Sequence, residues 1–194
     1  MNSENGGYPR LKVKAQSGQV ELAAGMFLIL FLTLFVHMLL QIDMFSAAAG
    51  YMEDALAASN LASAVIDVEE YGISHNVVID NPILAYERYR YALKENLNLD
   101  EEWKCANRNM IGGPVRIEEY IVYNCVQGRV EAFRVNESGV IAQWEGAAGD
   151  VYAPNGIVVE NTGVFSAVSF ETEGFLGVKV TARKGKLVDV ARNQ

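Results

Sequence analysis

The longest apolar run of the chain extends from Leu22 to Leu40 and reads LAAGMFLILFLTLFVHMLL, broken only by Thr33 and His37. As an α-helix, this run is about 28 Å long, close to the roughly 30 Å thickness of a bilayer's hydrocarbon core. Burying a helix that is apolar on all sides would require a larger domain than the remaining chain offers. The pattern therefore predicts a membrane span over about 20–40, and a cleaved secretory signal ending near 46–50 is the alternative.

A stripe of apolar positions at spacings of three and four continues after this run, at Ile42, Phe45, Ala49, Met52 and Leu56. Alanine, the best helix former, is frequent here, and the first strong stop signal is Gly72. We therefore expect one continuous helix over 19–71, with the span at about 20–40 and an amphipathic continuation over 41–71. Two helices separated by a break near 41–43 are the alternative.

The pattern changes beyond residue 72 to that of a small mixed domain. Asn81 followed by Pro82 is typical of a helix start and predicts a short helix over about 82–95. Alternating segments then predict strands at 115–126, 129–135, 140–146, 163–171, 175–183 and 186–191, with turns at NESG, PNG and RKGK. Strands so close in sequence favour antiparallel pairing. The predicted fold class is α+β: a long N-terminal helix and a small antiparallel-sheet domain, 72–194, with a short helix.

Charge is distributed unevenly around the apolar run. Residues 1–18 contain Arg10, Lys12 and Lys14 against Glu4, a net charge of +2, whereas the whole chain has a net charge of −8. By the positive-inside tendency, 1–18 is a basic cytoplasmic leader and 72–194 is extracytoplasmic. An acidic exterior without a basic stripe excludes nucleic acid as an expected partner, because phosphate neutralisation requires clustered Lys and Arg.

The two cysteines, Cys105 and Cys125, both fall in the predicted outer domain. Their spacing suits a disulfide loop worth about 3 kcal/mol in the loop-entropy account, and buried thiols are the alternative. Two cysteines cannot form a four-ligand zinc site, and neither histidine lies in a cluster with them, so we expect no metal. The sequence contains no phosphate-binding glycine loop, nucleophile elbow or metalloprotease motif, so we expect no cofactor, no catalytic residues and no enzyme activity.

Glu21 lies at the start of the apolar run, three residues after Gly18, in SGQVELAAGMFLILFLTLF. A carboxylate at the edge of a bilayer is unfavourable without a partner. One interpretation is a charge in the first turn of a helix, stabilised by the helix dipole by about 0.3–1 kcal/mol. The other is a residue that binds another subunit and sets the register of an assembly.

A short basic leader, a glycine, an early glutamate, an apolar stretch that merges into an amphipathic helix, and a β-rich C-terminal domain together resemble the type IV pilin superfamily. The segment SGQVELAAGMFLILFLTLF looks most like the tight-adherence (Tad) pilus pseudopilins, the TadE-like minor subunits. The resemblance implies a structural or assembly subunit of a pilus or secretion apparatus. It also implies leader removal by a prepilin peptidase between Gly18 and Gln19, and pairing of Glu21 with the α-amino group of an adjacent pilin-like subunit.

The register of the glutamate differs from the family pattern, in which it is the fifth residue of the mature chain. Cleavage after Gly18 makes Glu21 the third residue, and cleavage after Ala15 makes it the sixth. The alternative function is a single-pass, signal-anchored binding or accessory protein whose leader is not processed.

Overall fold

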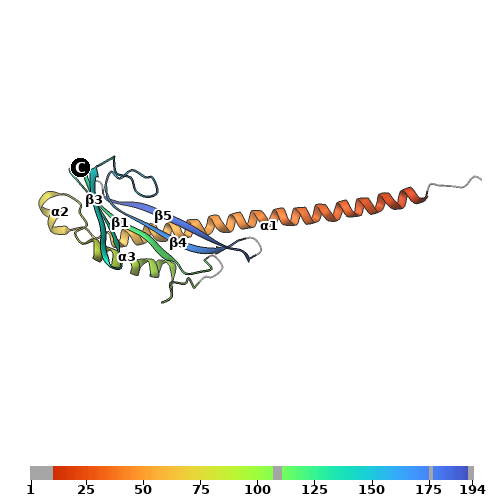
Figure 1. The fold of residues 1–194 in the computed structure, drawn as a ribbon, viewed down its shortest axis with the longest axis horizontal. Coiled ribbons are helices and arrows are strands. Elements are labelled where there is room, and N and C mark those ends of the chain that lie inside the picture. Colours follow the sequence, from red (N-terminus) through yellow and green to blue (C-terminus); the bar gives the residue numbers. More distant parts are fainter. Residues whose placement is uncertain (1–10, 107–110, 175–176, 192–194) are drawn as a thin grey trace, which may run out of the picture. The chain divides into compact units, whose positions relative to one another are not determined.

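The structure, a computed structural model, describes residues 11–106, 111–174 and 177–191. The chain divides into two units, Met1–Asp43 and Met44–Gln194. Helix α1 (Leu11–Ser63) provides residues 11–43 to the first unit and 44–63 to the second. A five-stranded antiparallel sheet and two shorter helices complete the second unit (Figure 1), which confirms the predicted α+β class.

Both ends of α1 differ from the predicted range of 19–71. The helix begins at Leu11, inside the predicted leader, and ends at Ser63. The break predicted as the alternative near 41–43 is absent, because α1 is helical throughout that range. The second unit accordingly begins at Met44 rather than at residue 72.

Helix α2 (Val68–Ser74) is separate from α1 because Asp67 starts a new helix. Its carboxylate accepts hydrogen bonds from the backbone N–H groups of Glu69 at 2.9 Å and Glu70 at 3.0 Å, which satisfies two of the donors that a helix start leaves unpaired. The backbone N–H of Asp67 meanwhile donates to Val78 O at 2.8 Å. His75, with a φ of 60°, caps the end of this helix. Gly72, which the sequence predicted as a cap, lies inside the helix.

Helix α3 (Pro82–Leu97) starts where it was predicted to start. Asn81 Oδ1 accepts from the backbone N–H of Leu84 at 2.9 Å, and Pro82 occupies the first turn, where a missing N–H has no cost. The helix ends two residues later than predicted, at Leu97, and its cap, Asn98, adopts a left-handed conformation with a φ of 48°. One face of α3 is buried, through Ala85, Tyr86, Tyr89, Leu93 and Leu97.

The strands lie in the order β3-β2-β1-β4-β5, and every neighbouring pair is antiparallel. Their bounds are β1 Arg116–Val126, β2 Arg129–Asn136, β3 Gly139–Ala147, β4 Thr162–Glu173 and β5 Lys179–Ala191. The first three follow the predicted strands closely, and the NESG turn connects β2 to β3. Residues 179–183 of the predicted strand 175–183, and all of the predicted strand 186–191, belong instead to the single strand β5. Residues 175–176 of that prediction lie outside the described residues.

The predicted RKGK turn is therefore wrong, and the reason is the position of Gly185. This residue pairs with Ala167 of β4, and a Cβ atom there would lie 2.9 Å from Phe165 Cζ. Glycine at this position makes room for the Phe165 ring rather than reversing the chain.

The sheet has a core on each face. On one face, residues 44–63 of α1 and helix α3 pack against β1 and β4 (Figure 1). On the other face, the connection between β3 and β4 supplies Val151, Ala153 and Val159 to a second core. Alternation along β1 divides its side chains: Tyr120 and Val122 face the helices, whereas Ile121 and Tyr123 face the connection.

Candidate functional site

The exposed part of α1 is the candidate functional feature of the first unit. Every side chain from Gly18 to Leu40 is exposed, on all sides of the helix, and large apolar residues predominate among them. Each large apolar side chain gains about 1.5–3 kcal/mol when it leaves water. Of the described helices, α1 is the one that is long and apolar enough to cross a membrane, within Gly18–Ser63. This segment therefore requires lipid or other protein around it.

The polar side chain of Thr33 is accommodated within the apolar segment by the helix itself. Its hydroxyl donates to Ile29 O at 2.8 Å, one turn earlier. A hydroxyl paired in this way avoids the several kcal/mol that an unpaired polar group costs in hydrocarbon. Phe31 and Phe35 stack along the same helix with ring centroids 6.4 Å apart.

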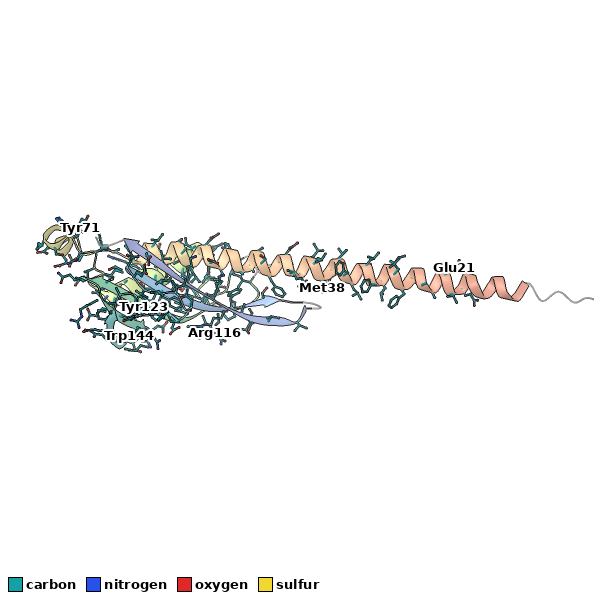
Figure 2. The ribbon with its side chains drawn as sticks, turned by 90° about the horizontal axis from the view of Figure 1, so that it is seen from above. Glu21, Met38, Tyr71, Arg116, Tyr123 and Trp144 are labelled. Atoms are coloured by element: carbon teal, nitrogen blue, oxygen red, sulfur yellow. The ribbon has the colours of Figure 1, made fainter. Side chains whose placement is uncertain are left out.

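Glu21 is exposed near the start of this segment and projects away from the helix axis, as Met38 does near its other end (Figure 2). Among the described residues, no ion pair involves Glu21. Gly18 and Gln19 lie on the same helix, within one turn of Glu21. The three predicted site residues are thus adjacent, and the Gly18–Gln19 peptide bond lies inside a helical segment.

The second unit holds residues 44–63 of α1 against the sheet, first through apolar and then through polar groups. Ala48, Met52, Ala55 and Leu56 are buried in the core on the helical side of the sheet. One turn further on, Ser59, Asn60 and Ser63 are also fully buried. Buried polar groups need hydrogen-bond partners, so their contacts determine how this part of the helix is attached.

Asn60 and Ser63 connect the helix directly to three strands. Asn60 Nδ2 donates to Lys186 O of β5 at 2.9 Å and to Val164 O of β4 at 3.3 Å. The Tyr120 hydroxyl of β1 donates to Ser63 Oγ at 2.8 Å. Burial raises the pKa of the Tyr120 hydroxyl, so it remains a neutral donor.

Glu53 adds a charged contact between α1 and β5, beyond the predicted span. Its two carboxylate oxygens lie 2.7 Å from Lys184 Nζ and 2.7 Å from Lys186 Nζ. The hydrogen bond from Lys184, followed by that from Lys186, lowers the pKa of Glu53 to about 2. Glu53 is therefore ionised throughout the neutral range and holds α1 beside β5.

The predicted pairing of Cys105 with Cys125 is wrong, because the two sulfurs lie on opposite faces of the sheet. Cys105 belongs to the core on the helical side, and its thiol donates to Leu97 O at 3.2 Å. Cys125 faces the other core, and its thiol donates to Glu160 O at 3.2 Å. Both are buried thiols, which is the alternative that the sequence left open.

A cavity of about 390 Å³ on the second unit opens beside Trp103, Arg116 and Glu137. Two aromatic residues that line the cavity also contact Arg90, whose Cζ lies 5.4 Å from the ring centroid of Trp103 and 5.9 Å from that of Tyr86. Its guanidinium also pairs with Glu137 at 3.0 Å. The wall of this cavity is thus aromatic and charged, which suits a polar ligand.

The role of Glu21 stays a prediction, and sequence reasoning missed the residues that attach α1 to the sheet. Ser59, Asn60 and Ser63 were available as a signal, since they place polar groups at helical spacing on a face that is apolar up to Leu56. The described residues contain no group of three or more metal-ligating side chains close enough to hold an ion.

Comparison with known proteins gives no relative for this chain. No protein-family model, no curated protein and no solved structure matches it.

Proposed function

We propose that this chain is a pilin-like structural subunit, anchored by α1 and assembled into a Tad-like or type IV-like pilus or secretion apparatus. The observation that supports it most is the division of α1 into two parts. Residues 18–40 are apolar and exposed on all sides, whereas residues 48–63 are attached to the sheet of the second unit. One helix can thus carry a folded domain and also provide an apolar surface for lipid first and for neighbouring helices later.

The orientation in this proposal places residues 1–18 in the cytoplasm and the second unit outside it. The basic residues before the span and the acidic second unit support this arrangement. The partners are the membrane, a prepilin peptidase and other pilin-like subunits.

The exposure of Glu21 suits the pairing between chains that this proposal requires. Cleavage after Gly18 would create a positive α-amino group on Gln19, two residues before Glu21. The Glu21 side chain is exposed and forms no ion pair among the described residues, so its carboxylate is accessible to the amine of an adjacent subunit. Such a pair would fix the axial register of an assembly.

Leader removal can be tested by comparing two glycines of the same helix. Gly18 and Gly25 are both in α1, and a Cβ atom on either would meet nothing within 4 Å. Gly18→Ile should block cleavage by an active prepilin peptidase, because the peptidase requires a small residue before the bond. Gly25→Ile changes the helix in the same way and should be cleaved normally. Mass spectrometry of the N-terminus in the native membrane distinguishes Gln19 from Met1.

The assembly step is tested separately with Glu21→Gln, which keeps the shape of the side chain and removes its charge. This variant should be cleaved normally and should be depleted from sheared surface filaments, because assembly requires the carboxylate and cleavage does not. Glu118→Gln, at an exposed position on β1, is the control and should assemble normally. Normal incorporation of the Glu21 variant would contradict the register role.

The second candidate is a signal-anchored binding module, and the cavity beside Trp103 is the observation that favours it. In that case the span is a permanent anchor, and the second unit binds a polar ligand outside the cell. An intact Met1 in cells that contain an active prepilin peptidase would support this candidate and contradict the pilin-like one.

A further inference from the structure

The cavity beside Trp103 is built by segments that are far apart in the sequence. Its lining comes from helix α3, the segment after this helix, strand β1 and the β2–β3 turn, and includes Tyr86, Trp103, Ile117, Asn136, Glu137 and Ser138. All of these residues belong to the second unit. A volume of about 390 Å³ is typical of sites that bind small molecules. The fold of the second unit therefore forms a cavity large enough for a small ligand.

Trp103 is held at this cavity in a backbone conformation that bulky residues rarely adopt, with a φ of 61°. Hydrogen bonds on both sides maintain it. The backbone N–H of Trp103 donates to Asp100 O at 3.0 Å, and Trp103 O accepts from the backbone N–H of Val115 at 2.8 Å. A strained backbone persists where the surrounding structure imposes it, and such positions are concentrated at functional sites. The placement of the Trp103 ring therefore supports a binding role for the cavity.

The charges beside the Trp103 ring already neutralise each other. Arg90 pairs with Glu137 at 3.0 Å. Lys94 pairs with Glu101 at 3.1 Å. Arg90 Cζ and Lys94 Nζ also lie 5.4 Å and 5.9 Å from the centroid of the Trp103 ring. A cationic ligand would therefore meet two positive charges at the aromatic wall, and an anionic ligand would compete with carboxylates that are already paired.

Arg116, the one basic residue of the lining, directs its charge elsewhere. It lies between Val115 and Ile117, which both pack into the core on the helical side of the sheet. Successive side chains of a strand point to opposite faces, so the side chain of Arg116 lies on the other face. The described lining residues therefore present no unpaired charge to the cavity.

The β2–β3 turn supplies hydrogen-bonding groups to the lining. Asn136 Oδ1 accepts from the backbone N–H of Ser138 at 2.8 Å, which orients the amide and leaves its Nδ2 group as a donor. Ser138 is exposed and adds a hydroxyl group. Glu137 pairs with Arg90 through Oε1, so its Oε2 can accept a further hydrogen bond. A ligand that carries several hydroxyl groups can donate to this carboxylate and accept from the amide.

We propose that this cavity binds a neutral sugar unit of an oligosaccharide. The C–H groups on one side of a sugar ring pack against aromatic side chains, whose ring faces carry partial negative charge. The hydroxyl groups of the sugar both donate and accept hydrogen bonds, whereas a purely apolar ligand would leave the polar groups of the turn desolvated and unpaired. The inference rests on the cavity of the second candidate function and names its ligand class. It holds equally for a pilin-like subunit, because it involves neither leader removal nor Glu21.

The experiment titrates the full chain with neutral oligosaccharides of glucose, mannose, galactose and N-acetylglucosamine, in a detergent that has no sugar headgroup. The chain contains two tryptophans, so Trp144→Phe leaves Trp103 as the fluorescent reporter. We expect a saturable change in Trp103 emission with at least one of these oligosaccharides. The dissociation constant should be the same at about 50 mM and about 500 mM NaCl, because screening by salt does not affect a neutral ligand.

A matched pair of asparagines tests whether the β2–β3 turn contacts the ligand. Asn136→Asp keeps the oxygen that accepts from Ser138 and removes the amide donor, so it should weaken binding about 3- to 10-fold. Asn155→Asp is the control. Asn155 Oδ1 accepts from the backbone N–H of Ile157 at 3.3 Å in the same kind of turn, and this residue lies outside the lining, so the control should bind as the parent does. Circular dichroism checks that both variants are folded.

Equal affinities of the Asn136 variant and its control would overturn the assignment of the site. No response to any of the neutral oligosaccharides, or a response only to an acidic one such as oligogalacturonate, would overturn the ligand class. Each of these results would leave the pilin-like function standing, because that function is tested by the mass of the N-terminus and by filament assembly.

Discussion

At the scale of single residues, Glu53 gives the attachment of α1 a defined dependence on pH. Its pKa in the folded chain is about 2, below its ordinary value of 4.5, because Lys184 and Lys186 stabilise the carboxylate. A lowered pKa means that the folded state binds this proton more weakly than the unfolded state does. The contribution of Glu53 to stability is therefore complete above about pH 5 and is lost as the pH falls from about 4.5 towards 2.

We expect Glu53→Gln to remove this part of the acid dependence. Urea unfolding of the full chain in detergent, followed between pH 2 and pH 7, should show less loss of stability for the variant than for the parent below about pH 4.5. Glu87→Gln, on the exposed side of α3, is the control for removing a carboxylate elsewhere. If the free energy of unfolding falls equally with pH for the Glu53 variant and the parent, the two lysines do not hold α1.

Single residues also show where the sequence was insufficient. Cys105 and Cys125 are separated by a distance in sequence that suits a disulfide, but spacing does not report the face of the sheet on which a side chain lies. The strand β1 directs Cys125 away from the helices, and that direction depends on the register of β1 against its neighbours. Likewise, the partners of Asn60 are carbonyl groups more than a hundred residues away, which no local pattern records.

At the scale of elements, the long strand β5 depends on Gly185. A methyl group at this position would meet Phe165, which is buried and has little freedom to move. Gly185→Ala should lower the free energy of unfolding by about 1–3 kcal/mol, as overpacking of a core commonly does. Thermal or urea unfolding measures the change, and Phe165→Leu in the same chain should recover part of it, because the two substitutions act on one contact.

The control for this prediction is Gly112→Ala, since a Cβ atom on Gly112 would meet nothing within 4 Å. Gly112→Ala should change the free energy of unfolding by no more than about 0.5 kcal/mol, as most surface substitutions do. A loss for Gly185→Ala no larger than for this control would show that Phe165 moves aside easily.

The elements that the sequence predicted well are those whose signals are local. Asn81 and Pro82 placed the start of α3, and NESG placed the β2–β3 turn, because capping and turn formation involve neighbouring residues. The end of α1 was missed because Gly72 was taken as the first strong stop signal, although Asp67 with two glutamates in the following turn is typical of a helix start. The RKGK segment was misassigned because its glycine, Gly185, leaves space for Phe165 of another strand and does not form a turn.

At the scale of the whole molecule, the two units should differ in solubility. The second unit has its own cores, and the first residue of α1 in them is Ala48. A chain that begins at Met44 should therefore stay monomeric without detergent and unfold cooperatively, whereas the full chain should require detergent because residues 18–40 expose their apolar side chains. Sedimentation and circular dichroism measure the two properties.

A chain that begins at residue 64 is the control for this truncation. It lacks Met52, Leu56 and Asn60, which are buried between the helices and the sheet, so cooperative unfolding should be lost. An unfolded chain from Met44, or a stable one from residue 64, would contradict the role given to residues 44–63.

The attachment of α1 to β5 also has a consequence for aggregation. An edge strand offers unpaired backbone groups to any passing strand, and charged side chains or a covering helix prevent such pairing. At the β5 edge, the side chain of Asn60 donates a hydrogen bond to one backbone carbonyl group of the strand. Four basic side chains also lie along this strand, at Lys179, Arg183, Lys184 and Lys186. At the β3 edge, Glu145 is the one charged residue of the strand. Chains at high local concentration are therefore protected from wrong strand pairing at β5 and are vulnerable to it at β3.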